Sequence, residues 1–101
     1  MHYVILLEDN ATADPGIRAR LMPDHLRFLE ANGDHILAAG PLKDESGAPA
    51  GGIWVIEAEN VHVAGQLIRE DPFWPTGLRQ SWRVLEWTRV FADGARLIQP
   101  G

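Results

Sequence analysis

The chain has no cysteine, so disulfides, thiolate nucleophiles and cysteine-based zinc sites are excluded. Basic clusters are missing too. The chain has nine Lys and Arg and 14 Asp and Glu, which gives a net charge of -5. That balance argues against a nucleic-acid partner or an anionic membrane surface. No apolar run approaches the roughly 20 residues that span a bilayer. The first residues lack the basic segment of a signal peptide, so we expect a cytoplasmic protein.

Motifs for metals, nucleotides and serine nucleophiles are also lacking. The four histidines show no metal-ligand spacing, and neither serine lies in a Gly-x-Ser-x-Gly turn. No Gly-x-Gly-x-x-Gly follows a strand, and we interpret Gly51-Gly52 as a loop pair rather than a phosphate cradle. The sequence therefore predicts neither a metal nor a cofactor.

Hydrophobic periodicity and turn residues predict the order β-α-β-β-α-β. Asp14-Pro15 and Asn60 are start signals for two helices, and Pro72 ends the second one after Asp71. Pro23 should kink the first helix or split it in two. Residues 43–52 are predicted to be a loop. The strands are expected at 3–7, 35–39, 53–58 and 79–87, and the helices at 15–31 and 61–70. This order is typical of an α+β, ferredoxin-like subunit with a four-stranded antiparallel sheet.

The predicted strands are apolar on both faces, although two short helices can cover only one. In the first strand, for example, Val4 and Leu6 are as apolar as Ile5 and Leu7. A second copy of the same sheet would cover the other face, so we expect a homodimer. The alternative is a monomer whose C-terminal tail folds over that face.

We expect one domain over residues 1–101, with 88–101 as a C-terminal extension. Asp93-Gly94 lies between short apolar pairs, a pattern that predicts a hairpin or a dimer contact. A frayed terminus is the competing interpretation.

A histidine occupies an apolar position in the first predicted helix. His25 continues the row of Ile17, Leu21 and Phe28, whose spacing places them on one helix face. Asp71 ends the second helix before Pro72. An inward imidazole and a carboxylate at a helix end can meet as a base and the group that orients it. The alternative is a satisfied core histidine and an ordinary helix end.

Three further residues are candidates for binding a substrate beside this pair. Arg18 lies about two helical turns before His25 and could bind a carboxylate or phenolate, or be a solvated helix arginine. Phe73 and Trp74 follow Asp71 and could line an aromatic pocket. Phe73 could equally be part of the core.

Several short motifs, taken together in their order and spacing, are specific enough to indicate a protein family. They are Arg18 with Pro23-x-His25-Leu26-x-x-Leu29, Gly33 with Ala39-Gly40-Pro41-Leu42, Asp71-Pro72-Phe73 with Gly77, and Val90-Phe91. Their order and spacing resemble the YciI-like (YCII-related) family almost from end to end. The resemblance implies a subunit that pairs into a dimeric α+β barrel, with an active site around His25 and Asp71. Relatives often carry Arg where this chain has Met22, which implies a different substrate choice here.

The leading hypothesis is a small cofactor-independent lyase, isomerase or dehydrohalogenase acting on a small cyclic or aromatic acid or phenol. His25 would move a proton, Asp71 would fix its tautomer, and Arg18, Phe73 and Trp74 would bind the substrate. The alternatives are a non-catalytic domain that binds a small molecule, and a cofactor-free monooxygenase. Fold analogy alone does not choose among them.

Overall fold

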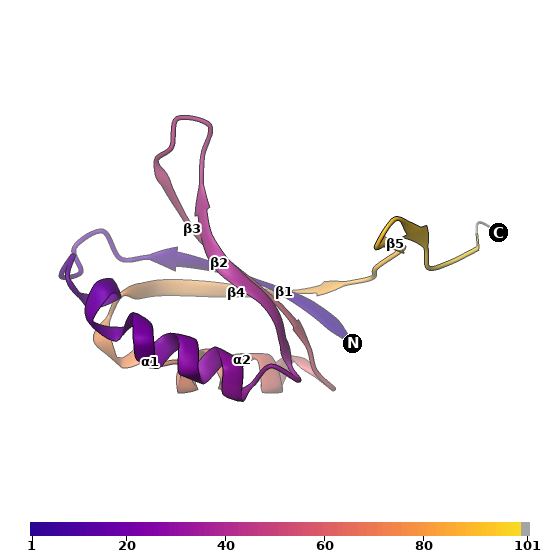
Figure 1. Ribbon diagram of the computed structural model, residues 1–101, viewed down its shortest axis with the longest axis horizontal. Helices are drawn as coiled ribbons and strands as arrows, with labels where there is room; N and C mark the ends of the chain where they lie inside the picture. The colour runs from indigo at the N-terminus through magenta and orange to yellow at the C-terminus, as the bar shows by residue number, and fades with distance from the viewer. Residues whose placement is uncertain (100–101) are drawn as a thin grey trace.

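Four strands form one antiparallel sheet. β1 (His2–Asp9) and β3 (Pro49–Glu57) are central, while β2 (Ile36–Lys43) and β4 (Arg79–Trp87) are the edges. The computed structural model describes residues 1–99 (Figure 1). Its element order confirms the predicted α+β, ferredoxin-like β-α-β-β-α-β subunit.

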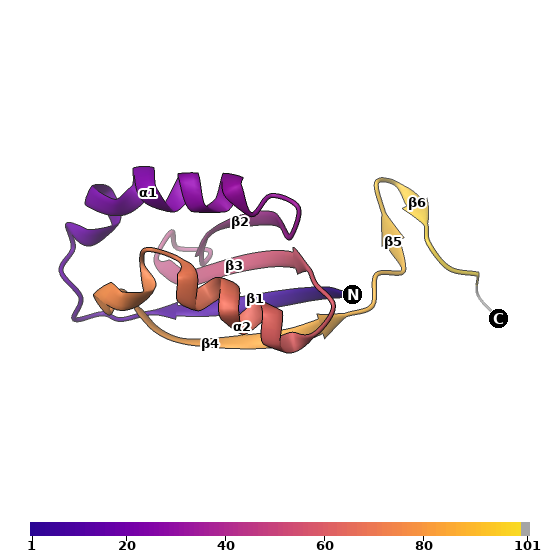
Figure 2. The ribbon, with the colours of Figure 1, turned by 90° about the horizontal axis from the view of Figure 1, so that it is seen from below.

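Both long helices, α1 (Ile17–Ala31) and α2 (Val61–Glu70), lie on the same side of the sheet (Figures 1 and 2). They cover a core in which alternate strand residues point toward the helices. Neither helix found in residues 1–99 has the length and apolar character needed to cross a membrane. The main buried residues are Tyr3, Ile5, Leu7, Ile36, Trp54, Ile56, Ala64, Leu67 and Ile68.

The start of α1 differs from the prediction. Asp14 accepts a hydrogen bond from the backbone N–H of Gly16 (2.9 Å), which closes a turn before the helix, and the helix begins only at Ile17. Pro23 does not split α1, which is continuous to Ala31. The other helix matches its start signal, because the Asn60 side chain accepts hydrogen bonds from two backbone N–H groups in the first turn of α2.

The loop predicted over residues 43–52 was wrong in its bounds, because the observed loop is shorter. β2 continues to Lys43 and β3 begins at Pro49, so only 44–48 form the turn. Asp44 closes this turn, because its carboxylate accepts hydrogen bonds from the backbone N–H groups of Ser46 and Ala48. The hairpin therefore projects well beyond the helices (Figure 1).

A separate hairpin follows the main sheet. β5 (Phe91–Ala92) pairs antiparallel with β6 (Ala95–Arg96). Asp93 and Gly94, with φ of 52° and 77°, form the turn between them. The hairpin lies away from the four-stranded sheet, and Phe91 is largely exposed on it (Figure 2).

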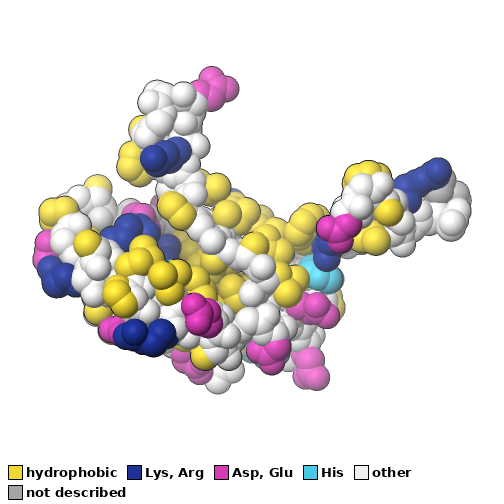
Figure 3. All heavy atoms as spheres, viewed as in Figure 1, with side chains coloured by type: hydrophobic (Ala, Val, Ile, Leu, Met, Phe, Trp, Pro, Cys, Tyr) yellow, Lys and Arg dark blue, Asp and Glu magenta, His cyan; other side chains and the backbone are white. Residues whose placement is uncertain are grey.

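The sheet face opposite the helices is apolar and has no cover within residues 1–99. Val4 lies between Val55 and Leu85, and Leu6 is opposite Ile53, so these side chains share one face. We call these five residues the open face. Figure 3 shows hydrophobic side chains gathered over the sheet between the two projecting hairpins.

We predict that a second copy covers the open face and that the protein is a homodimer at micromolar concentration. Val55→Asp places a charge on this face and should give a monomer, because the charge would be desolvated in the interface. Val61→Asp is the matched control, because Val61 is exposed on α2. Light scattering tests both variants, and a stable wild-type monomer would contradict the prediction.

Candidate functional site

The contact predicted between His25 and Asp71 is present. His25 projects from the buried face of α1, and Asp71 is the C-cap of α2, where Pro72 stops the helix. Nδ1 of His25 lies 2.7 Å from Oδ1 of Asp71. The two residues are only 8% and 2% exposed. A buried carboxylate and a buried imidazole therefore meet across 46 residues of sequence.

Asp71 is held in place by more than the histidine. Its Oδ1 also accepts a hydrogen bond from the backbone N–H of Phe73 (3.3 Å). Its Oδ2 lies 3.7 Å from Nη2 of Arg79. Because an ionised carboxylate can only accept hydrogen bonds, this arrangement places the proton of a neutral imidazole on Nδ1. Nε2 of His25 has no hydrogen-bond partner within residues 1–99 and is available to a ligand.

Aromatic rings fix the plane of the imidazole. The ring centroid of Phe73 is 4.5 Å from that of His25, and Trp54 lies at 6.4 Å. Phe73 is completely buried and packs with Ile17 and Leu78 in a small cluster of its own. Packing on this scale restricts the rotamer of His25, as a base in a pre-organised site requires.

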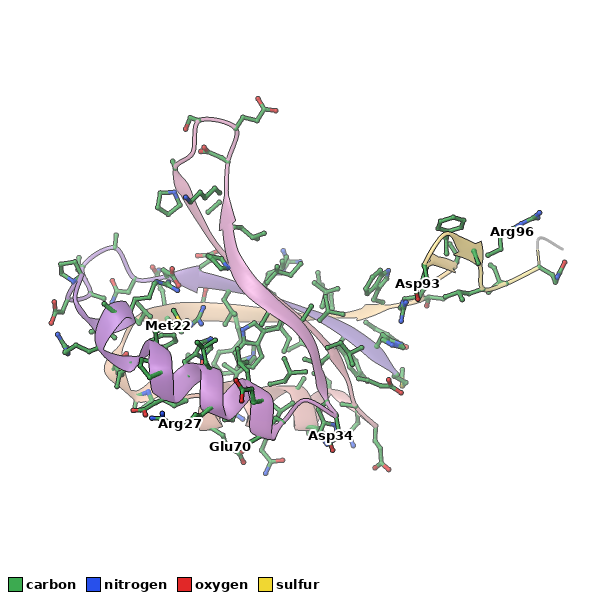
Figure 4. The ribbon with its side chains drawn as sticks, viewed as in Figure 1. Met22, Arg27, Asp34, Glu70, Asp93 and Arg96 are labelled. Atoms are coloured by element: carbon green, nitrogen blue, oxygen red, sulfur yellow. The ribbon has the colours of Figure 1, made fainter. Side chains whose placement is uncertain are left out.

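His25 lines a cavity of about 170 Å³ between α1 and the β2–β3 side of the sheet. The wall from α1 is mostly apolar, with Met22, Leu26 and Leu29 beside His25 and Arg18. Figure 4 shows Met22 on the side of α1 toward the sheet. Where the family resemblance leads us to expect an arginine, this chain therefore has a thioether in the cavity wall.

The opposite wall includes the two glycines that sequence analysis assigned to a loop. Gly51 and Gly52 belong to β3 and line the cavity with Trp54. A Cβ at Gly52 would lie 3.4 Å from Nη1 of Arg79. Gly52 therefore leaves room for the guanidinium, whereas a Cβ at Gly51 would point at the backbone of Leu7.

Arg18 and Arg79 both line the cavity, but their partners differ. Nη2 of Arg18 lies 2.6 Å from Oδ2 of Asp9, which is a full ion pair. Nη1 of Arg79 is 3.7 Å from Oδ1 of the same Asp9. Burial lowers the pKa of the Arg79 guanidinium, whereas Asp71 and Asp9 act to raise it. Asp9 and Arg79 were not predicted as site residues, because they stand at strand ends, where exposed charges are common.

The structure brings together four of the five predicted site residues and not the fifth. Arg18, Phe73, His25 and Asp71 are neighbours, with the Arg18 guanidinium 5.8 Å from the Phe73 ring. Two of the predicted pocket-lining residues are corrections. Phe73 is completely buried and packs against His25 without lining the cavity. Trp74 is not part of the cavity wall either. Its ring packs edge-on against Trp82 at 4.6 Å, since the 3₁₀ turn η1 (Trp74–Thr76) directs it there.

Within residues 1–99, no three His, Cys, Asp or Glu side chains gather into a group that could hold a metal ion. The cavity instead offers an imidazole with its orienting carboxylate, two guanidinium groups and apolar walls. Such a set can move a proton and hold a small anion.

Comparison with known proteins gives a fold neighbour and a family. The 5-chloro-2-hydroxyhydroquinone dehydrochlorinase from Burkholderia phenoliruptrix, solved in complex with 2,5-dihydroxybenzoquinone, is similar with a TM-score of 0.73 and 24% identity. The match covers 87% of this chain and 94% of that chain, and at this identity it shows the shared fold. No functionally curated protein sequence matches the chain. The YCII-related domain matches residues 1–88, and the chain therefore belongs to the YCII-related domain family.

Proposed function

We propose that the protein is a small enzyme that transfers a proton on a small cyclic or aromatic acid or phenol, in a lyase, isomerase or dehydrohalogenase reaction. The observation that carries this proposal is the buried His25–Asp71 pair, whose histidine lines a cavity of about 170 Å³. A buried, oriented imidazole next to an open cavity is the arrangement expected of a general base.

The chemistry follows from the two ring nitrogens. Nδ1 of His25 donates to Asp71, so Nε2 carries the lone pair that accepts a proton from the substrate. Asp71 then stabilises the imidazolium across the 2.7 Å contact. A general base of this kind contributes about 10²–10⁴-fold to the rate.

An elimination would balance without any oxidant. The proton goes to Nε2 of His25, its former bonding pair forms a new π bond, and the leaving halide departs with the electron pair of its own bond. The fold neighbour, by its name, is a dehydrochlorinase of a chlorinated hydroxyhydroquinone. That name supports dehydrohalogenation as the first reaction to test here.

Cavity size supports a substrate with one ring. An apolar cavity of about 150 Å³ suffices to bind benzene. The cavity beside His25 measures about 170 Å³, and most of its lining is apolar. A single ring with a few small substituents therefore fits.

The first test is binding, with 2,5-dihydroxybenzoquinone as the probe. At 100 times its Kd, a ligand stabilises the native state by about 2.7 kcal/mol, which corresponds to roughly 10–20 °C in Tm. Calorimetry should show such a rise for the wild type. His62→Ala is a matched control because His62 is exposed on α2, and it should behave as the wild type does. No rise at millimolar probe would contradict the proposed ligand class.

Turnover is tested with 5-chloro-2-hydroxyhydroquinone by measuring released chloride under nitrogen. Chloride release that depends on the protein supports the elimination. Saturable binding without turnover of this compound or of related phenols would instead favour a non-catalytic binding domain. Oxygen consumption in air with these substrates would favour a cofactor-free monooxygenase.

A further inference from the structure

The guanidinium of Arg79 is a buried cation whose hydrogen bonds are poorly satisfied. Its side chain is 5% exposed, and its Nε is enclosed with no hydrogen-bond partner within residues 1–99. Nη1 and Nη2 lie 3.7 Å from oxygens of Asp9 and Asp71, beyond the hydrogen-bond range of about 2.7–3.2 Å. Buried polar groups normally have partners, so this exception calls for an explanation.

Arg18 has the opposite character, although it lines the same cavity. Its Nη2 is 2.6 Å from Asp9, and its side chain is 37% exposed. An ion pair of this length already balances the charge of Arg18, and solvent hydrates the exposed part of its side chain. An incoming anion would have to compete with Asp9 for Arg18, but it would displace no existing short contact at Arg79.

Arg79 also stands next to the proposed base. The Arg79 guanidinium and the His25 ring both contact Phe73, at 5.5 Å and 4.5 Å from its centroid. They also approach different oxygens of Asp71. Since both residues line the same cavity, one ligand can contact both of them.

We propose that Arg79, rather than Arg18, binds an ionised oxygen of the substrate beside the atom that gives its proton to His25. This inference rests on the proposed function and narrows its substrate class to single-ring compounds that bind as anions, such as phenolates or enolates. As the proton leaves, negative charge grows on that oxygen, and a buried guanidinium stabilises it more strongly than water would. Arg79 would then be a catalytic residue and the main determinant of anion preference.

The test compares two probes of nearly equal shape, 4-nitrophenol at a pH where it is ionised and its neutral methyl ether, 4-nitroanisole. A charge-assisted hydrogen bond predicts that the wild type binds the phenolate about 10–100-fold more tightly than the ether. Bound 4-nitrophenol should also ionise at a lower pH than free 4-nitrophenol, and absorbance measures this directly.

Arg79→Gln should remove the preference for the phenolate while leaving the affinity for the ether nearly unchanged. Arg79→Lys should retain part of it, and Arg18→Gln should retain most of it. Equal losses for both probes in Arg79→Gln would show that Arg79 only balances the buried carboxylates. A preference that follows Arg18 instead, or a failure of both probes to bind at millimolar concentration, would overturn the proposal.

NMR of the wild-type protein keeps the test decisive if Arg79→Gln does not fold. The chemical shift of the Arg79 Nε–Hε signal should change on addition of 4-nitrophenol and not of 4-nitroanisole. A chemical shift that changes with neither probe overturns the proposal. These binding measurements require no turnover. Anion preference that depends on Arg79, together with turnover that does not depend on His25, would therefore reject the proposed function and leave Arg79 as an anion-binding residue with no part in proton transfer to His25.

Discussion

His25→Ala is expected to lower turnover by about 10²–10⁴-fold, the contribution of one general base, once a substrate is established. The fold and the dimer should remain, because the lost side chain borders a cavity that water can enter. Asp71 keeps its hydrogen bond from the Phe73 backbone N–H in this variant. Single-turnover kinetics and a thermal melt measure the two effects separately.

Asp71→Asn completes this prediction, because an amide preserves the shape of the carboxylate but loses its charge. Turnover should fall strongly, since the imidazolium loses its counter-charge while the 2.7 Å geometry can persist. Some stability should be lost too, because the Arg79 guanidinium loses one of its two carboxylate neighbours. Large losses of stability and of the dimer in both variants would show a structural pair instead of a catalytic one, since an unsatisfied buried group costs roughly 1–3 kcal/mol or more.

Gly51→Ala should cause the largest loss of stability among the cavity residues. Gly51 has a φ of 84°, and a Cβ there would collide with the carbonyl oxygen of Leu7. The left-handed conformation alone costs a residue with a Cβ about 1–3 kcal/mol, and the collision with the backbone of β1, at the end of its pairing with β3, adds to it. A loss of about 2–3 kcal/mol would lower the Tm by roughly 8–24 °C.

Gly47→Ala is the matched control for this substitution. Gly47 has nearly the same φ, 86°, but a Cβ there meets nothing within 4 Å. The difference in Tm between the two variants therefore isolates the collision with Leu7. Equal melting temperatures would show that the strand pairing relaxes around the new methyl group.

Much of the fold could be predicted because its signals are local. Asn60 and Pro72 mark the ends of α2, and the β4 range matches the predicted 79–87. The β2–β3 hairpin was underestimated because glycines and prolines are typical of loops. Gly51 instead adopts a positive φ within a strand that pairs on both sides. Gly52 pairs with Pro41 of β2 and with Leu7 of β1, and the partner in β1 is distant in sequence, so a local pattern does not contain it.

In the candidate site too, residues marked by a local sequence pattern were predicted and the others were not. His25 was identifiable because a polar residue interrupted an apolar helix face, and Asp71 because a proline followed it. Arg79 carried no such signal, since its burial arises only when Asp9 and Asp71 come together around the cavity. Trp74 was misplaced because the rotation of a short 3₁₀ turn decides which way its ring points.

One oxygen of Asp71 receives both the His25 imidazole and the backbone N–H of Phe73. The two donors therefore share a single acceptor, and the position of the imidazole is thermodynamically coupled to the conformation of the turn after Pro72. Coupling of this kind is reciprocal, so a ligand that moves the His25 ring also changes how firmly that turn is ordered. Conversely, any contact that tightens the turn acts on the proposed base from outside the cavity.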